Sequence, residues 1–357
     1  MTEFSTKVYE NDTYVSPIVL DEVVDERGVT LRHVRVKDIS EQSPTREAMQ
    51  DRIAAYDKYL VENPDLLPPQ SGDDGQLFDL NVVSAEIYDS PGMRDWRREL
   101  VPNAEALIPM QRPDITNLPL YRVFSRAGEI VDIKGGQEVD EVARSFYTDA
   151  LDSIGIRTRA AVMSDTARRY VQPGEHSKWV SLACGAALPV LEALKVVSRN
   201  GADAHLTLVD YNQGTLLTAQ EMAEGGGLVE GDQFSIKNRN LVTDMIISDK
   251  FVQEYGEESA AMVDALGIFE YFNDERSAAF LHNSYRLVKP GGALVIANML
   301  SSRPELDFNQ RGIGWPKIYP RSIKEIIDIV AAAGIDTGAV TVTIPEDGVY
   351  GVVEIKK

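Results

Sequence analysis

The segment from residue 179 to residue 212 constrains the fold more than any other part of this 357-residue chain. An apolar run, residues 179–182, leads into a turn of small side chains, and a helix-forming stretch follows at residues 189–197. A second apolar run, residues 206–209, ends in Asp210. This order predicts a βαβ unit. Its turn lets the backbone approach a ligand closely, and the acid can accept hydrogen bonds from a ribose. The segment therefore predicts a site for an adenosine-containing cofactor.

Strand and helix patterns alternate through the second half of the chain. Such alternation predicts a mostly parallel sheet covered by helices. The predicted strands are residues 179–182, 206–210, 234–238, 260–266 and 293–298, and the predicted helices are residues 189–197, 214–223, 241–255, 274–287 and 322–333. Two further apolar runs, 339–344 and 349–355, flank a short turn. Only antiparallel neighbours can be joined so tightly, so we expect the last strand to run against the others.

The first 136 residues form an irregular α+β pattern. Two hairpins are predicted at residues 17–36 and 120–133, and a helix is predicted to begin at Ser43 and Pro44 and to end near Val61. Consecutive glycines at 135 and 136 then interrupt the chain, and two helices are predicted at residues 137–154 and 157–171. We therefore expect an N-terminal extension, residues 1–136, and an α/β domain, residues 137–357.

Charge and residue usage exclude several classes of function. The formal net charge is −20, and no basic stripe interrupts it. A field of that sign repels phosphate backbones, so we expect no nucleic-acid partner. The chain opens on a polar segment and has no apolar run of the roughly 18 residues that a membrane span needs, so we expect a cytoplasmic protein without a membrane partner. Cys184 is the one cysteine, and the four scattered histidines predict no metal site.

Four segments make the chain similar to one enzyme family. They are VSLACGAA, LTLVDYN, AAMVDALGIFEYFNDE and YRLVKPGGALVIANM. In these segments the chain resembles the class I S-adenosylmethionine-dependent methyltransferases, over roughly residues 137–357. The resemblance implies an α/β, Rossmann-like fold with a mostly parallel seven-stranded sheet and an antiparallel last strand. It also implies that residues 137–357 are the catalytic domain, with residues 1–136 as a cover over the substrate.

The first of these segments departs from the family's pattern. That pattern reads acid-x-glycine-x-glycine-x-glycine, and the matching positions here are Ser181, Ala183, Gly185 and Ala187. The chain thus keeps only the central glycine. Alanine adds one methyl group, so the turn remains feasible, while the affinity for the cofactor becomes an open question. The third segment also lacks the Asn-Pro-Pro-aromatic signature of enzymes that methylate the amino groups of nucleic-acid bases.

The resemblance implies S-adenosyl-L-methionine as the cofactor. Gly185 would let the cofactor lie on the backbone, and Asp210 would accept hydrogen bonds from both ribose hydroxyls. Tyr211 would pack on the adenine, and Asn240 would reach the adenine amino group. Each residue also has a plainer explanation: a tight turn, a helix N-cap or a core aromatic. The predicted cofactor-binding residues are Ala183, Cys184, Gly185, Ala186, Asp210, Tyr211, Asn240, Leu241, Asp264, Ala265 and Leu266.

The predicted catalytic residues lie at the end of the fourth strand and in the loop after it. By family position the carboxylate of Asp264 faces the reacting methyl group, where it can remove a proton from an acceptor. Tyr271 is the second candidate, and His176 is a weaker one. Arg157 and Arg159 precede the first strand and are candidates for binding the cofactor's carboxylate, although basic residues on a helix face are more often solvated.

Three functions fit these observations. The first is methyl transfer to a small-molecule acceptor by in-line displacement, in which the protein aligns the acceptor with the methyl group. The second is transfer of the aminocarboxypropyl or aminopropyl arm of the same cofactor. The third is a non-catalytic, methyltransferase-like module that binds a partner, which the altered glycine pattern favours. The sequence leaves the acceptor and the oligomeric state open.

Overall fold

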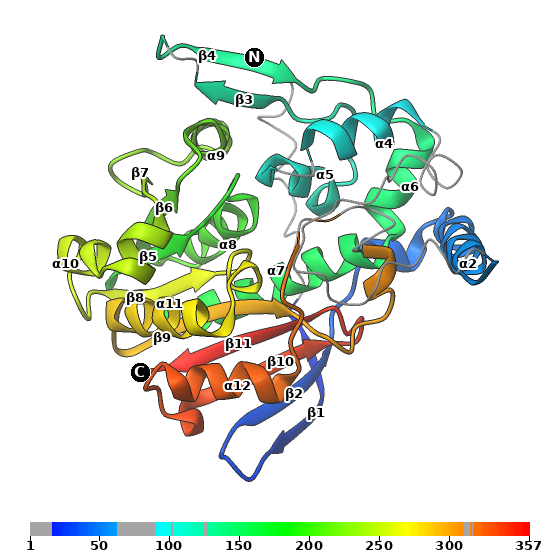
Figure 1. Ribbon diagram of the computed structural model, residues 1–357. Coiled ribbons are helices and arrows are strands. Elements are labelled where there is room, and N and C mark those ends of the chain that lie inside the picture. The colour runs from blue at the N-terminus through cyan, green and yellow to red at the C-terminus, as the bar shows by residue number, and fades with distance from the viewer. Residues whose placement is uncertain (1–15, 63–89, 101–102, 125–126, 310–314, 316) are drawn as a thin grey trace. The chain divides into compact units, whose positions relative to one another are not determined.

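The computed structural model describes residues 16–62, 90–100, 103–124, 127–309, 315 and 317–357 (Figure 1). The chain forms two compact units. Unit 1 consists of Met1–Lys37, Thr158–Ser302 and Ile318–Lys357, and unit 2 consists of Asp38–Arg157 and Arg303–Lys317. Each unit is thus assembled from segments that are distant in the sequence. The expected division at residue 136 stays a prediction about which parts fold on their own.

Unit 1 contains a nine-stranded sheet with the strand order β1-β2-β10-β11-β9-β8-β5-β6-β7. Strands β5 to β9 pair in parallel, whereas β11 runs antiparallel to both β9 and β10. The predicted α/β class with a largely parallel sheet is confirmed. The strands are β1 Ile18–Val24, β2 Thr30–Arg35, β5 His176–Leu182, β6 Asp203–Asp210, β7 Phe234–Asn238, β8 Ala260–Ala265, β9 Val288–Met299, β10 Val340–Pro345 and β11 Tyr350–Lys356.

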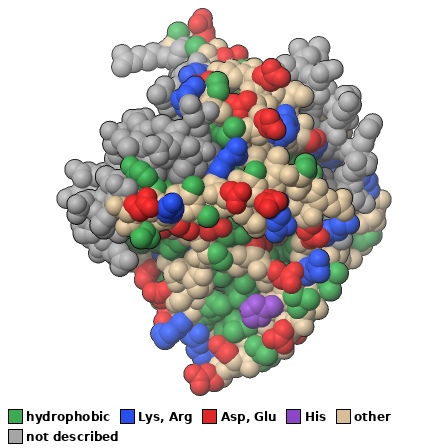
Figure 2. Space-filling model, turned by 90° about the vertical axis from the view of Figure 1, so that its right-hand side faces the viewer, with side chains coloured by type: hydrophobic (Ala, Val, Ile, Leu, Met, Phe, Trp, Pro, Cys, Tyr) green, Lys and Arg blue, Asp and Glu red, His purple; other side chains and the backbone are tan. Residues whose placement is uncertain are grey.

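The sheet has more than the expected seven strands because an N-terminal hairpin joins it. β1 and β2 pair antiparallel, and the carboxylate of Asp25 closes their turn by accepting from Arg27 N and Val29 N at 2.9 Å each. β2 then pairs in parallel with β10, with Thr30 opposite Thr341. All residues of the edge strand β1 are exposed, so hydrophobic side chains reach the surface there, on the lower part of the face in Figure 2.

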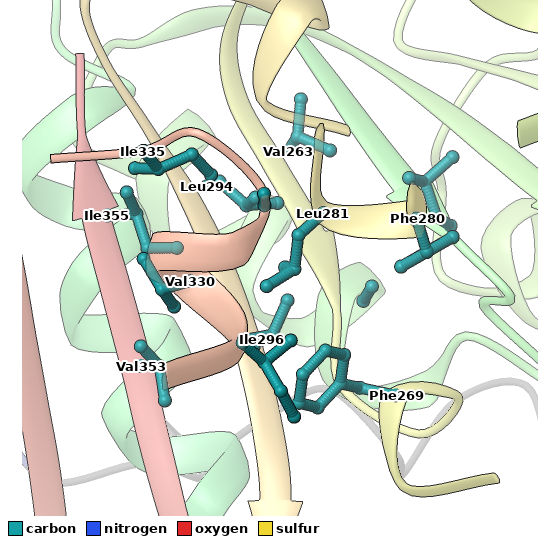
Figure 3. Close-up of a cluster of buried hydrophobic side chains, with 14 of the residues drawn as sticks. Val263, Phe269, Phe280, Leu281, Leu294, Ile296, Val330, Ile335, Val353 and Ile355 are labelled. Carbon is teal, nitrogen blue, oxygen red and sulfur yellow. The ribbon is translucent and has the colours of Figure 1, made fainter. Parts of the chain in front are cut away.

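The helices of unit 1 cover the sheet. One face packs against three helices through a large apolar cluster, because every second strand residue points to that face. Figure 3 shows Val263, Leu294 and Ile296 of the strands close to Phe280 and Leu281 of a helix. Burying an aliphatic side chain of this size contributes about 1.5–3 kcal/mol. Besides the part of α7 (Leu151–Tyr170) from Thr158 onward, the α-helices are α8 Leu188–Arg199, α9 Gln213–Gly225, α10 Lys250–Tyr255, α11 Asp274–Leu287 and α12 Ile323–Ala332, of which the last three form this cluster.

Two predicted helix boundaries were wrong. The helix expected at residues 241–255 is divided into η5, Val242–Ile247, and α10, because Ser248 between them is extended, with φ −138° and ψ 177°. The break expected near residue 155 lies at Ala150, whose ψ of 139° ends α6, Glu141–Asp149, before α7 begins. α7 runs over Leu151–Tyr170 and includes Gly155.

Unit 2 is mainly helical in its described part. Its core includes Trp96, Phe146 and Tyr147, whose ring centroids lie 5.0–6.0 Å apart. Its elements are η1 Ile39–Gln42, α2 Arg46–Glu62, α4 Pro91–Asp95, η3 Trp96–Leu100, η4 Ala104–Ala106, α5 Leu107–Gln111, the hairpin of β3 Tyr121–Phe124 and β4 Ile130–Lys134, α6, and the start of α7. Across all the residues described, no helix is both long enough and apolar enough to cross a bilayer.

Candidate functional site

The turn after β5 has a left-handed backbone at every second residue. Ala183, Gly185 and Ala187 have φ angles of 51°, 55° and 60°. This conformation costs an alanine about 1–2 kcal/mol, whereas glycine adopts it readily. The three residues stand at the three glycine positions of the methyltransferase pattern, so the chain keeps a glycine-like backbone where it has lost two glycines. Backbone strain of this kind is concentrated at functional sites.

Asp210, the last residue of β6, ties this turn to the neighbouring strand. Its Oδ2 accepts a hydrogen bond from Gly185 N, and its Oδ1 accepts one from Asn212 N, both at 2.9 Å. The residue is only 7% exposed, and burial raises the pKa of its carboxyl. Asn212, not Asp210, caps α9, so the plainer explanation of Asp210 as a helix cap is excluded. Each carboxylate oxygen can accept a further hydrogen bond, which leaves capacity for a ligand.

The remaining predicted cofactor residues lie in different environments. Tyr211 is 73% exposed, so it is not a core aromatic. Asn240 is exposed and accepts from Val242 N at 3.0 Å, which is the helix-capping role weighed against adenine binding. Cys184 is partly buried, and burial raises the pKa of its thiol, which opposes a nucleophilic role. The other side chains of this set, Ala186, Leu241, Ala265 and Leu266, are buried. Their contacts with a cofactor stay predictions.

Asp264 is enclosed by the neighbouring strand. It is 1% exposed, Trp179 Nε1 donates to its Oδ2 at 2.6 Å, and Ser181 Oγ donates to its Oδ1 at 2.8 Å. Ser181 lies directly opposite Asp264 in the pairing of β5 with β8. The family's pattern has an acid at the position of Ser181. In this chain the carboxylate next to that position is the one of Asp264, on the adjacent strand. This geometry favours a role in holding β5 in place, and the role of Asp264 as a base stays a prediction.

Burial also makes Asp264 sensitive to pH. Desolvation raises the pKa of Asp264 to about 7, against an ordinary value of 3.8. Between these two pH values the folded chain holds a proton that the unfolded chain releases, so stability is lost as the pH rises. The quantity to follow is the free energy of unfolding of the unaltered chain minus that of Asp264→Asn. We expect this difference to fall by up to about 1.4 kcal/mol per pH unit from pH 4 to 7 and then to level off.

Asp264→Asn is a matched replacement because an amide has the shape of the protonated acid. It can donate to Ser181 Oγ and accept from Trp179 Nε1. Urea unfolding of both proteins at several pH values between 5 and 8 measures the difference. Asp210 and Glu305 also have raised pKa values, and the comparison cancels their contributions. Parallel pH profiles of the two proteins would show that Asp264 does not titrate in this range.

The loop after β8 is anchored at one point and open at another. The Glu270 side chain accepts from Met299 N at 3.2 Å, and its carbonyl accepts from Tyr319 N at 2.7 Å. A Cβ added to Gly267 would meet no heavy atom within 4 Å. Tyr271 is partly buried at the end of η6, Phe269–Tyr271. The sequence indicated the loop but not the anchoring role of Glu270.

The remaining basic candidates have separate environments. Arg157 belongs to unit 2, where its guanidinium pairs with Asp38 at 2.7 Å and donates to backbone carbonyls, so it is structural. Arg159 is buried in unit 1 rather than solvated. His176 begins β5, at the opposite end of that strand from the turn, and pairs with Asp203 at 2.9 Å. Within the described ranges, no group of three or more His, Cys, Asp or Glu side chains is arranged to hold a metal ion.

Comparison with known proteins shows similarity in structure but not in sequence. No protein-family model matches the chain, and no curated protein matches it significantly. A solved structure titled as a possible exported protein from Bordetella parapertussis is 17% identical. The match covers 88% of this chain and 99% of that protein, with a TM-score of 0.57. At this identity the similarity shows a shared fold.

Several other matching structures carry the name of methyltransferases. An O-methyltransferase family protein from Burkholderia thailandensis is 18% identical, and the match covers 61% of this chain and 63% of that protein, with a TM-score of 0.40. The S-adenosylmethionine-dependent methyltransferase SibL is 14% identical, with coverage of 88% and 77% and a TM-score of 0.45. The largely parallel sheet of unit 1, with β11 antiparallel to its neighbours, agrees with the fold that the sequence resemblance to the class I methyltransferases implies.

Proposed function

We propose that the chain binds S-adenosylmethionine at the turn after β5 and transfers a methyl group to a small-molecule acceptor. The turn itself carries the proposal, through its alternating left-handed residues and the hydrogen bond from Gly185 N to Asp210. An adenosine-containing ligand needs both a closely approaching backbone and an acid at the end of the next strand. When bound, the cofactor supplies a methyl group attached to a sulfonium sulfur. The neutral thioether that remains after the transfer is a good leaving group.

The residues of the turn and of the two neighbouring strand ends are assigned to holding the cofactor. Asp210 accepts hydrogen bonds from the ribose hydroxyls. The exposed ring of Tyr211 offers a face for the adenine, and Asn240 and Leu241 border the same end of the ligand. The backbone of residues 183–186 lies along the ligand because the side chains there are small.

Proton removal from the acceptor is assigned to the end of β8 and its loop. Tyr271 and Asp264 are the two candidates, and a positioned base typically contributes about 10²–10⁴-fold to the rate. Tyr271 is the more accessible of the two, since it is partly buried while Asp264 is enclosed with both oxygens engaged. Asp264 would then serve the reaction by keeping β5 and its turn in register with β8.

The charge of the chain supports a small molecule as the acceptor. A formal net charge of −20 repels the phosphates of a nucleic acid, attracts cationic compounds and does not oppose neutral ones. The amino groups of nucleic-acid bases are further disfavoured because the loop after β8 lacks the Asn-Pro-Pro-aromatic signature.

Calorimetric titration with S-adenosylmethionine and with S-adenosylhomocysteine tests the proposal first, and NADH serves as the control nucleotide. We expect saturable binding of the first two and none of NADH. Mass spectrometry of the nucleoside product then separates the reactions. S-adenosylhomocysteine indicates methyl transfer, whereas methylthioadenosine indicates transfer of the arm. If the chain binds neither S-adenosylmethionine nor S-adenosylhomocysteine, the result favours the non-catalytic module.

A further inference from the structure

The segment of residues 303–309 follows β9 in the chain and belongs to unit 2. A single side chain of α7 holds both of its ends. Arg303 Nη1 and Asn309 Nδ2 donate to the same oxygen, Oδ1 of Asp152, at 2.5 and 2.6 Å. Asp152 is 2% exposed and Arg303 is 4% exposed. This ion pair is therefore buried, and the two charges compensate each other, as buried charges must.

Helix α2 holds the same segment near its middle. The hydroxyl of Tyr56 donates to Asp307 Oδ2 at 2.9 Å. The ring of Tyr56 also packs edge-on against the ring of Phe308, with centroids 5.1 Å apart, and both rings are buried. The segment is thus docked on two helices, α7 and α2, through contacts that all lie within unit 2.

Glu305, inside this segment, is strained and lacks a donor. Its φ of 58° is left-handed, which is uncommon for a residue other than glycine. Its carbonyl accepts from Asn309 N at 3.1 Å, so the position of Glu305 is tied to a side chain that Asp152 holds. Glu305 Oε2 is buried without a hydrogen-bond partner, and so is Oδ2 of Asp152. An ionised carboxylate can only accept hydrogen bonds, whereas a protonated one carries a donor of its own.

The charges around Glu305 disfavour its ionised form. Asp152 of α7 and Asp57 of α2 repel a negative charge there, and Arg303 attracts it. Because Arg303 already compensates Asp152, ionised Glu305 adds a negative charge that no further cation balances within this group. Burial, followed by the charge of Asp152, raises the pKa of Glu305 to about 7, from an ordinary value of 4.5.

We infer that Glu305 is a pH sensor that keeps residues 303–309 docked on α7 and α2 while it holds a proton and lets them detach when it ionises. The inference goes beyond the proposed function and does not depend on a bound cofactor. On ionisation the proton passes to solvent, and the carboxylate of Glu305 is repelled by Asp152 and Asp57. In the detached segment Glu305 is solvated, so it takes the ordinary pKa of 4.5. Docking is therefore strongest below this pH, weakens as the pH rises to about 7 and then levels off.

Hydrogen exchange followed by mass spectrometry tests this inference on the full-length chain between pH 5 and 8. Exchange rates are divided by the intrinsic rates at each pH, so that only structural protection remains. We expect the protection of the backbone amides of residues 306–309 to fall by up to about tenfold per pH unit, or about 100-fold from pH 5 to 7. The helix α6 of the same unit is the internal standard and should keep its protection.

Two substitutions of glutamate by glutamine show whether Glu305 is the group that titrates. Glu305→Gln keeps the shape and neutral charge of the protonated acid. Its protection at pH 8 should match that of the unaltered chain at pH 5. Glu47→Gln, the same change at an exposed position of α2, controls for the change in net charge and should keep the pH dependence.

Four outcomes contradict the inference. Protection of residues 306–309 that does not change with pH in the unaltered chain shows that the segment has no switch in this range. An unchanged pH dependence in Glu305→Gln shows that another group titrates. Equal loss of protection in α6 shows that unit 2 opens as a whole. Low protection of Glu305→Gln at every pH shows that the carboxyl group supports the segment without acting as a sensor.

Discussion

Gly185→Val is expected to abolish cofactor binding while the sheet of unit 1 still forms. Gly185 is the central residue of the turn, and on the proposed function a branched side chain there intrudes on the cofactor. Valine also disfavours the left-handed φ of 55°, so the free energy of unfolding should fall by about 1–2 kcal/mol. Calorimetry should show at least about a 100-fold loss of affinity for S-adenosylmethionine, or about 2.7 kcal/mol.

Gly185→Ala is the matched control for this substitution. Ala183 and Ala187 already adopt the same conformation, so the turn tolerates a methyl group at these φ angles. We expect Gly185→Ala to fold with a smaller loss of stability than the valine variant and to retain part of the binding. Normal affinity of Gly185→Val would show that the cofactor does not lie across this turn.

Asp210→Ala should weaken binding of S-adenosylmethionine at least about tenfold. On the proposed function, the substitution removes the acceptor for both ribose hydroxyls, and two charge-assisted hydrogen bonds together contribute on the order of 2–4 kcal/mol. It also removes the acceptor for Gly185 N, so the turn itself loses a restraint. The measurement is calorimetric titration of the variant and the unaltered chain at the same pH.

Asn212→Ala separates the ribose contact from support of the surrounding structure. Asn212 caps α9, and its backbone N–H bonds the same carboxylate, so its loss disturbs this region without removing the acid. Loss of the cap should lower stability by about 1 kcal/mol and change the affinity little. If Asn212→Ala and Asp210→Ala weaken binding equally, the carboxylate does not contact the ribose.

The alternating elements of unit 1 could be predicted from the sequence because their signals are local. The predicted bounds of β7 and α11 coincide with Phe234–Asn238 and Asp274–Leu287. The place of the β1–β2 hairpin in the sheet could not be predicted. Its partner strand β10 lies far along the chain, and no local sequence pattern indicates which strand pairs with β2. The breaks at Ala150 and Ser248 also lacked a signal, because neither residue is a glycine or a proline.

The candidate site was only partly readable. Asp210 and the turn followed from spacing, but the left-handed alanines did not, since alanine carries no conformational signature. The enclosure of Asp264 had a signal that sequence reasoning missed. An acid within an apolar strand needs donors on a neighbouring strand, and Trp179 and Ser181 alternate onto one face of β5.

The pairing of β2 with β10 sets an order of events during synthesis. Thr30 and Thr341 are neighbours in the sheet, although more than three hundred residues separate them in the chain. At common rates of elongation, β2 leaves the ribosome roughly 15–60 s before its partner exists. During that interval the hairpin has no sheet to join, and Val29 and Val34, which are buried in the folded chain, stay exposed. The β1–β2 hairpin therefore joins the sheet only after β10 has been made, and completion of unit 1 waits for the synthesis of β10 and β11.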